Sequence, residues 1–339
     1  MASGLRVPPF IAFFLAGCMV LLGPRPAWAQ ALAQATALDD ILGSIVRIEA
    51  RVPSSARSAR TLGTERSGSG AVIDSEGLIV TIGYIVTDAT DVTVTTASGA
   101  QVPAELVAYD YETGLGLVRT LKTLNVKPIR LGDSDGARER TPTVITGFGG
   151  KEAVRGAYVV SRRTFTGYWE YMMEDAVYTA PFYEGFGGAA LLDGEGRLIG
   201  VGYVAVSDAA GPGTGLAGNM FVPINRLKAI LPDMIEHGRG KGAGRPWLGV
   251  QTQEVGGRLF VMRVNPESPA SEAGIKHGDI LLTLNGRPLD SQADFYRRLW
   301  SSGEPGTMVE FTILQGVGIN TLKVRTVDRN VLFPIGRAN

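Results

Sequence analysis

The chain has 339 residues, of which 45% are hydrophobic, so it is long enough to bury a sizeable core and to form two domains. It carries 33 basic and 33 acidic residues, and this balance excludes a global electrostatic attraction to nucleic acid or to anionic membranes. Forty-five glycines, roughly twice the average share, indicate many turns and favour a mostly β architecture.

Residues 1–29 have the pattern of a secretory signal peptide. Arg6 supplies the positive region, Phe10 to Leu22 form an apolar stretch, and Ala27-Trp28-Ala29 offers a cleavage site after Ala29. The apolar stretch is too short to span a hydrocarbon layer of about 30 Å, so no integral membrane span is expected. We therefore expect a periplasmic or secreted protein.

Cys18 is the only cysteine, and it leaves an alternative open. The residues Leu15 to Cys18 are similar to a lipoprotein cleavage box, which would leave Cys18 lipidated at the new N-terminus. The apolar stretch continues past Cys18, which favours cleavage after Ala29. The mature chain would then contain no thiol, no disulfide and no cysteine metal ligand.

After a spacer at residues 30–40, residues 41–237 are predicted to form the first domain. Leu42 to Ala50 alternate apolar and polar residues as a first strand does, and Arg51 to Ser67 are polar and predict a loop. Short β-like segments punctuated by glycine and aspartate follow, which is typical of a packed antiparallel fold. Helical spacing appears only from Ile224 to Ile235, with Pro232 as an expected kink.

Three segments in this domain carry a family resemblance. They are Ser67 to Asp74 with Leu78 to Val86, Asp110 to Val118, and Gly185 to Leu191 with Gly196 to Gly200. In this order and spacing they resemble the HtrA/Deg family of serine proteases. The resemblance implies a trypsin-like double β-barrel.

None of the three catalytic residues of the family is found at its matching position in these segments. Tyr84 stands at the position of the family's histidine, Gly114 at that of its aspartate and Gly187 at that of its serine. A serine nucleophile needs a general base, and the base needs a group that fixes its tautomer. Glycine has no side chain to attack with, and an unperturbed phenol is about a thousandth ionised at neutral pH. These residues predict an inactive protease homologue.

Other side chains of the domain receive simpler interpretations. Tyr84 is expected to fill the space of the lost imidazole, and Phe186 either to plug the former cleft or to anchor its loop. Glu184 and Asp110 are expected to be solvated surface carboxylates. The two histidines, His237 and His277, are far apart in sequence, so no metal site and no cofactor are predicted.

Residues 238–246 have the composition of a flexible linker, and residues 247–330 resemble a PDZ domain of the HtrA type, a small α+β fold. Arg263 to Ala270, Ala273 to Leu281 and Leu284 to Gly286 carry this resemblance. Ser291 with Asp294 predicts the start of a helix. The resemblance implies a groove that binds peptides by strand addition, with backbone N–H groups receiving a terminal carboxylate. The implied peptide-binding residues are Trp247, Leu248, Gly249, Val250, Phe295 and Leu299.

Two functions remain open from the sequence. The favoured one is an exported pseudoprotease that binds polypeptide C-termini or unfolded proteins, as a scaffold or regulator in the cell envelope. The alternative is an active envelope endopeptidase that uses a non-standard site or one completed by a partner subunit. The family resemblance also implies a homo-trimer or a mixed oligomer with an active relative.

Overall fold

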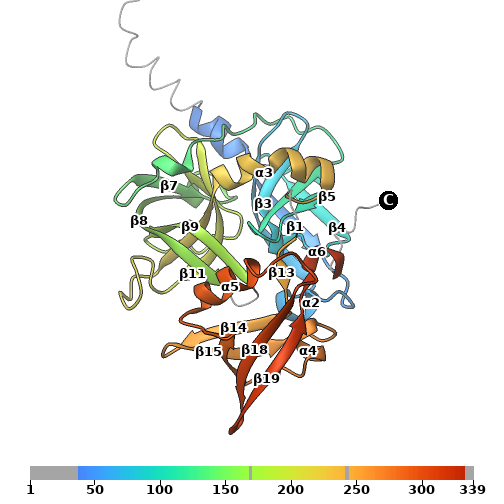
Figure 1. Cartoon of the computed structure of the whole chain (residues 1–339). Helices are drawn as coiled ribbons and strands as arrows, with labels where there is room; N and C mark the ends of the chain where they lie inside the picture. Colours follow the sequence, from blue (N-terminus) through green and yellow to red (C-terminus); the bar gives the residue numbers. More distant parts are fainter. Residues whose placement is uncertain (1–36, 168–169, 241–243, 333–339) are drawn as a thin grey trace, which may run out of the picture. The chain divides into compact units, whose positions relative to one another are not determined.

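The strands of the first domain close into two six-stranded antiparallel barrels, the double β-barrel that the family resemblance implies (Figure 1). The computed structural model describes residues 37–167, 170–240 and 244–332, so the predicted signal peptide lies outside the described residues. The strand order is β1-β2-β3-β6-β5-β4 in the first barrel and β10-β11-β12-β9-β8-β7 in the second. None of the helices in these ranges is long and apolar enough to cross a membrane.

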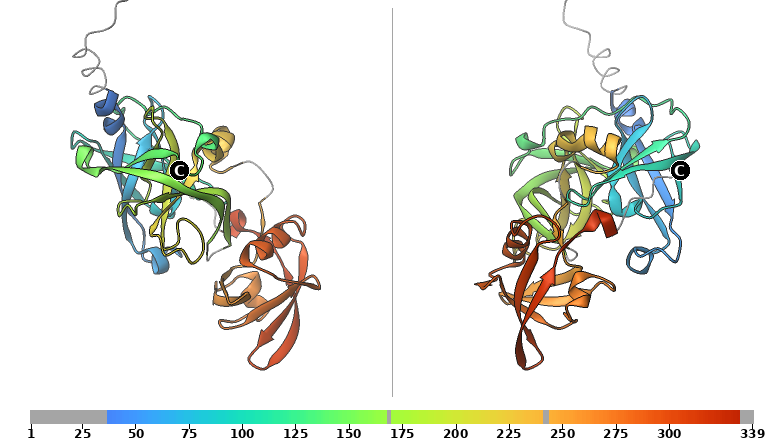
Figure 2. Two further views of the ribbon diagram at one scale, coloured as in Figure 1. Left: turned by 90° about the vertical axis from the view of Figure 1, so that its left-hand side faces the viewer. Right: turned by 45° about the vertical axis from the view of Figure 1, so that its right-hand side comes forward.

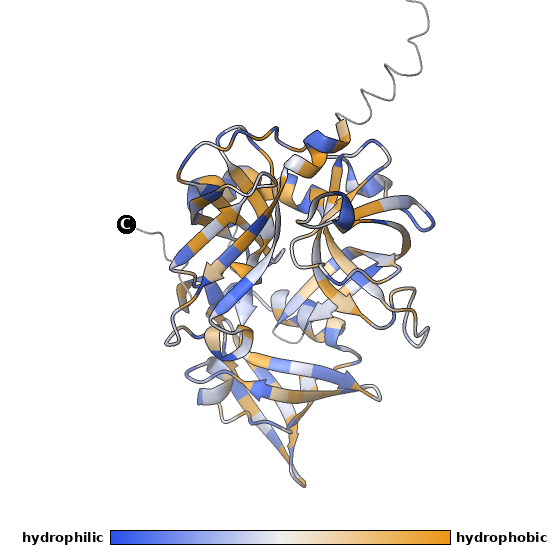
Figure 3. Cartoon of the chain, turned by 180° about the vertical axis from the view of Figure 1, so that it is seen from behind, coloured by the Kyte–Doolittle hydropathy of each residue, from blue (hydrophilic) through white to orange (hydrophobic). Residues whose placement is uncertain are grey.

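The first barrel is built around alternating apolar side chains, and Figure 3 shows the resulting mixture of hydrophobic and hydrophilic positions along its strands. In β1 the side chains of Ile45, Val46, Ile48 and Ala50 are buried, while Arg47 and Glu49 face solvent. The strands are β1 (Ile45–Arg51), β2 (Glu65–Val72), β3 (Leu78–Ile82), β4 (Asp91–Thr95), β5 (Gln101–Tyr109) and β6 (Leu115–Thr120).

Two predictions for the start of this barrel are wrong. Residues 37–43 are helical, so the first strand begins at Ile45 rather than Leu42, where pairing with Ala71 of β2 becomes available. The predicted loop at 51–67 contains the short helix α2 (Ala59–Leu62) and the start of β2. Arg66 is buried there because its guanidinium donates hydrogen bonds to the carbonyls of Tyr84 and Thr87.

The second barrel carries a long hairpin formed by β8 and β9. The strands are β7 (Pro142–Thr146), β8 (Val154–Gly167), β9 (Tyr171–Ala180), β10 (Ala190–Leu192), β11 (Leu198–Val206) and β12 (Gly218–Pro223). Three 3-10 helices connect the barrel strands: η1 (Gly83–Ile85), η2 (Ser134–Gly136) and η3 (Gly150–Ala153). The hairpin extends to Gly167 on one strand and to Tyr171 on the other, which pair with each other.

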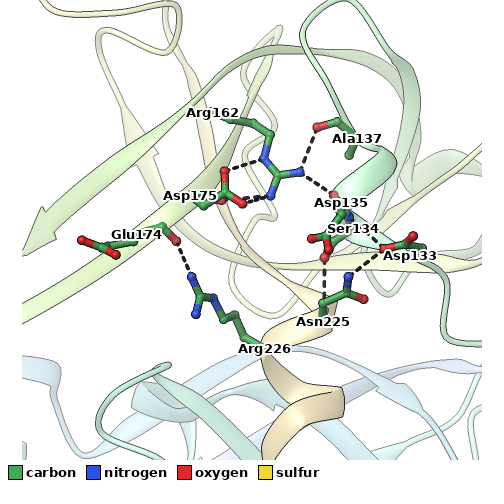
Figure 4. A network of polar contacts seen from close by, with 9 residues as sticks. All are labelled: Asp133, Ser134, Asp135, Ala137, Arg162, Glu174, Asp175, Asn225 and Arg226. Atoms are coloured by element: carbon green, nitrogen blue, oxygen red, sulfur yellow. Dashed lines mark hydrogen bonds and ion pairs between the residues drawn. The ribbon is translucent and has the colours of Figure 1, made fainter.

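Helix α3 (Ile224–His237) begins and ends as its spacing predicts, with Pro232 inside it and Gly238 in a left-handed conformation at its C-terminus. It packs against β5 of the first barrel and β11 of the second. A polar network joins its first turn to the β8–β9 hairpin (Figure 4). Arg162 of β8 pairs with Asp175 of β9 and donates to the carbonyl of Ser134, and Arg226 of α3 donates to the carbonyl of Glu174.

The C-terminal domain combines a six-stranded antiparallel sheet with short helices, and β18 and β19 form its longest hairpin (Figure 2). The sheet contains β14 (Val250–Val255), β15 (Arg258–Val264), β16 (Ile280–Leu284), β17 (Arg287–Pro288), β18 (Met308–Gln315) and β19 (Gly318–Arg325). The small sheet pairs β13 (Pro246–Trp247) with β20 (Val327–Asp328), and the helices are α4 (Pro269–Glu272), α5 (Gln292–Trp300) and α6 (Arg329–Leu332).

Helix α5 starts as predicted. The Ser291 side chain accepts a hydrogen bond from the backbone N–H of Asp294, so the serine is the N-cap. Phe295 and Leu299 are fully buried and contribute to an apolar cluster with Leu248 and Val250. The helix therefore packs beside β14, where the resemblance implies a peptide groove.

Candidate functional site

The three positions at which the resemblance places the catalytic triad lie on separate elements of the two barrels. Tyr84 belongs to η1 after β3, Gly114 to the turn before β6, and Gly187 to the loop between β9 and β10. Backbone hydrogen bonds fix these segments: the N–H of Gly83 donates to the carbonyl of Gly114 over 2.8 Å, and the N–H of Ser69 to that of Gly187 over 2.8 Å. The fold thus brings the predicted positions into one region.

The hydroxyl of Tyr84 lies close to the place that a side chain on Gly187 would take. A Cβ built on Gly187 would be 3.0 Å from the Tyr84 hydroxyl oxygen, which is closer than ordinary van der Waals contact. The same hydroxyl donates a hydrogen bond to the carbonyl of Tyr203 at 3.0 Å. Burial raises the pKa of Tyr84 above its usual value, so the phenol stays protonated at neutral pH and offers no general base.

Aromatic rings fill the space beside Gly114. A Cβ there would lie 3.0 Å from Tyr203 and 3.4 Å from Tyr171, and its φ of +75° disfavours any residue with a side chain. The rings of Tyr171 and Tyr203 stack with centroids 4.9 Å apart, and the Tyr171 hydroxyl donates to the carbonyl of Thr113 at 2.8 Å. Phe165 meets both rings edge to face. We call Tyr84, Phe165, Tyr171 and Tyr203 the aromatic cluster.

A cavity of about 370 Å³ opens beside this cluster and is lined by Tyr84, Gly114 and Tyr203. Four arginines also line it: Arg57, Arg60, Arg263 and Arg329. The sequence left open whether Phe186 plugs the former cleft or anchors its own loop. In the structure the centroid of its ring lies 6.5 Å from that of Phe182. In the described residues no three His, Cys, Asp or Glu side chains gather as metal ligands would.

The prediction that Asp110 is a solvated surface carboxylate is wrong. Its side chain is buried and accepts hydrogen bonds from the backbone N–H and the hydroxyl of Thr113, each at 2.7 Å. These bonds hold the turn that ends at Gly114, so Asp110 has a structural role. Glu184 is exposed, as expected.

The C-terminal domain presents three converging backbone donors. The N–H groups of Leu248, Gly249 and Val250 all point to one carboxylate, that of Glu170 between β8 and β9. The distances to its oxygens are 3.1 Å from Leu248, 2.6 Å from Gly249 and 2.9 Å from Val250. These donors lie where the resemblance predicts a carboxylate-binding loop, and here they bind a carboxylate of the chain itself.

Glycine is required in this carboxylate-binding loop. Gly249 has a φ of +88°, and a Cβ on it would lie 2.3 Å from the Cβ of Ser268. The other predicted peptide-binding residues surround the loop: Trp247 ends β13, Val250 begins β14, and Phe295 and Leu299 face them from α5. Five of these side chains are at most 4% exposed: Trp247, Leu248, Val250, Phe295 and Leu299. In this structure they therefore form the apolar floor of the predicted peptide groove and do not line an open groove.

Comparison with known proteins places both domains. Residues 68–201 match the trypsin-like peptidase domain and residues 246–326 the PDZ domain. The periplasmic serine endoprotease DegP of Escherichia coli is 32% identical over 243 residues, which cover 67% of this chain and 50% of DegP. The chain belongs to the HtrA family.

Other HtrA proteins agree with this assignment. The periplasmic pH-dependent serine endoprotease DegQ of Escherichia coli is 30% identical over 269 residues, covering 74% of this chain and 57% of DegQ. The solved structure of the HtrA-type protease AlgW with a decapeptide is 22% identical, has a TM-score of 0.51, and covers 87% of this chain and 98% of AlgW. The chain spans about half the length of the curated HtrA relatives it matches.

Sequence reasoning did not find Glu170. Its partners lie 78 to 80 positions away in another domain, and no local pattern distinguishes it from a solvated glutamate. Its burial, with 5% of its surface exposed, and its φ of +53° are visible only in the folded HtrA chain.

Proposed function

We propose that this HtrA protein binds polypeptide C-termini through its PDZ groove and does not hydrolyse peptide bonds. The observation that carries the proposal is the contact between the Tyr84 hydroxyl and the position of a side chain on Gly187. Gly187 carries no nucleophilic side chain, and the group beside it is a half-buried phenol that donates a hydrogen bond to the carbonyl of Tyr203. Neither the nucleophile nor the general base that acyl transfer needs is present at these two positions.

The binding half of the proposal is supported by the three N–H donors of the PDZ loop. Backbone N–H groups at 2.6 to 3.1 Å from carboxylate oxygens are suited to the terminal carboxylate of a peptide. Strand β14 then offers main-chain hydrogen bonds to the residues that precede the terminus. The predicted signal peptide supports the periplasm as the compartment, and the relatives DegP and DegQ are named as periplasmic proteases.

Proteolysis is tested with the purified mature protein and casein, with Escherichia coli DegP as the active control. We expect no casein cleavage and no labelling by a fluorophosphonate probe, because loss of a triad lowers turnover by on the order of 10⁶. Time-dependent labelling of one residue together with turnover would establish the endopeptidase function in place of the proposed one.

Peptide binding is tested by titration of fluorescein-labelled decapeptides with an apolar last residue, as free acids and as amides. We expect the free acids to bind and the amides to bind at least tenfold more weakly, since the amide removes the charge that the N–H donors recognise. Equal affinity of the two forms contradicts carboxylate recognition at the loop.

A further inference from the structure

The tip of the β8–β9 hairpin contacts the PDZ domain through three chemically different groups. The Glu170 carboxylate accepts the hydrogen bonds of the loop donors. The carbonyl of Gly167 accepts from the Tyr296 hydroxyl at 2.9 Å and from the Gln292 amide at 3.1 Å, both on α5. The Met172 side chain is 7% exposed and belongs to the apolar cluster of the PDZ domain.

These three groups reproduce the chemistry of a bound peptide end. A peptide terminus offers a carboxylate to the loop, an apolar side chain to the floor and carbonyl groups to neighbouring donors. Glu170, Met172 and Gly167 offer the same three kinds of contact from one hairpin. A second carboxylate has no unshared place at the loop, because Glu170 already accepts from all three donors.

The hairpin is held in this position by further contacts. Arg297 of α5 forms an ion pair with Glu174 of β9 at 3.0 Å, and Arg226 of α3 donates to the carbonyl of that same glutamate. The described chain from Leu38 onward packs as a single unit. Glu170 itself adopts a left-handed backbone conformation, which is uncommon for a glutamate and is compensated here by the contacts of its side chain.

We propose that Glu170 is an internal ligand that closes the PDZ groove, and that a partner polypeptide must displace its carboxylate to bind. This inference rests on the proposed function, because it assumes that the groove accepts polypeptide C-termini. The displacing partner carries a free terminal carboxylate for the loop and an apolar last residue for the place of Met172. The groove is therefore a regulated site whose affinity is set by competition within the chain.

Occupancy of the loop is tested without any peptide, by amide hydrogen exchange at Leu248, Gly249 and Val250 in the full mature protein. We expect exchange at these positions to become at least tenfold faster in Glu170→Ala, and to stay unchanged in Glu139→Ala. Glu139 is an exposed glutamate of the same barrel, so it controls for loss of a carboxylate. Unchanged exchange in Glu170→Ala overturns the internal ligand.

Competition is tested with the fluorescein-labelled decapeptides ending in Val, Leu or Phe as free acids. We expect Glu170→Ala to bind them at least tenfold more tightly than the wild type, while the amides gain nothing. Glu170→Gln keeps the size of the side chain and removes its charge, so it replaces Glu170→Ala if the alanine variant does not fold. We expect its gain in affinity for the free acids to be smaller. Equal affinity of wild type and variants for the free acids overturns the competition.

These experiments distinguish a failure of the proposed function, binding of polypeptide C-termini, from a failure of the internal-ligand proposal for Glu170. If Glu170→Ala accelerates exchange but no variant binds a free acid better than an amide, the internal contact exists and the groove does not recognise termini. That result contradicts the proposed function and with it the displacement step. If free acids bind the wild type and Glu170→Ala equally, the proposed function stands and only the internal ligand is rejected.

Discussion

At the residue scale, three tyrosines approach the glycines at which the resemblance places catalytic side chains. Tyr84 blocks the side-chain position of Gly187, and Tyr171 with Tyr203 blocks that of Gly114. Stacked and edge-to-face aromatic pairs each contribute about 0.5–1.5 kcal/mol beyond burial, so the cluster is a stable filling of the site. We therefore expect that introducing triad residues at these positions alone does not create an active site.

The variant Gly187→Ser tests this filling directly. We expect it to lower the free energy of unfolding by about 1–3 kcal/mol, because the new Cβ lies 3.0 Å from the Tyr84 hydroxyl. Adding Tyr84→His relieves the contact and recovers stability. Urea denaturation measures both, and a Gly187→Ser variant as stable as the wild type contradicts the packing argument.

The triple variant Tyr84→His, Gly114→Asp, Gly187→Ser is expected to remain inactive on casein. The aspartate would adopt a φ of +75° and meet the rings of Tyr203 and Tyr171. It would then be strained and displaced from the position that orients a histidine. Fluorophosphonate labelling of residue 187 in this variant would show that the aromatic cluster gives way.

Gly249 offers a second test at this scale. We expect Gly249→Ala to destabilise the protein by more than about 1–3 kcal/mol, since it combines a φ of +88° with a Cβ 2.3 Å from that of Ser268. Gly257→Ala is the matched control, because its φ of +70° is equally unfavourable but no atom lies within 4 Å of its Cβ. Equal melting temperatures for the two variants contradict a close approach at Gly249.

At the element scale, the β8–β9 hairpin carries a titratable group into the PDZ domain. Burial raises the pKa of Glu170 to about 7, and the hydrogen bonds from Val250, Leu248 and Gly249 lower it only in part. The charged or titratable groups around it are Arg329, Arg245, Glu112, Tyr111, Tyr171 and Tyr296. Of these, Arg329 favours the carboxylate, and Arg245 pairs with Glu112 at 2.9 Å.

This pKa sets the direction of a pH dependence. A carboxyl that titrates near 4.5 when unfolded and near 7 when folded binds more protons in the folded state between those values. Its contribution to stability is therefore complete below pH 4.5 and is lost as the pH rises to 7, by about 3 kcal/mol in all. We expect urea denaturation at pH 5 and pH 8 to show this loss in the wild type and not in Glu170→Gln. Because Glu112 is present in both proteins, its contribution cancels when their pH profiles are subtracted. Equal pH profiles contradict the assignment of this pH dependence to Glu170.

Ionisation of Glu170 also makes peptide binding to the PDZ groove depend on pH. Opening the hairpin returns Glu170 to water and releases its proton between pH 4.5 and 7, so opening becomes easier as the pH rises. Free-acid decapeptides are expected to bind the wild type more tightly at pH 8 than at pH 5.5. The affinity of Glu170→Gln is expected to change less over this range.

At the scale of the whole molecule, local patterns predicted the elements and missed what joins them. The helix from Ile224 and the cap at Ser291 follow from spacing and from short-range hydrogen bonding, so both could be read from the sequence. The strand predicted at Leu42 to Ala50 begins only at Ile45, where pairing with β2 starts, and residues 37–43 form a helix that the sequence pattern did not predict. Asp110 and Glu170 are buried by contacts with distant segments or tight turns, which residue type alone does not indicate.

Adjacent residues of the hairpin belong to two different cores, which predicts how the molecule unfolds. Tyr171 stacks on Tyr203 within the barrels, and Met172 packs in the apolar cluster of the PDZ domain. Loss of one core therefore exposes the other, and we expect a single calorimetric transition with equal calorimetric and van't Hoff enthalpies. The double variant Glu170→Ala, Met172→Ala removes two of the contacts that link the cores, the Glu170 hydrogen bonds and the packing of Met172, at a cost of about 2–5 kcal/mol for the methionine. We expect the contacts that remain, at Gly167 and Glu174, to be too few to keep the cores coupled, so that this variant unfolds in two transitions. Glu139→Ala, Met262→Ala makes the same two changes at exposed positions and is expected to keep one. Two transitions in the wild type, or one in the Glu170→Ala, Met172→Ala variant, would contradict the coupling.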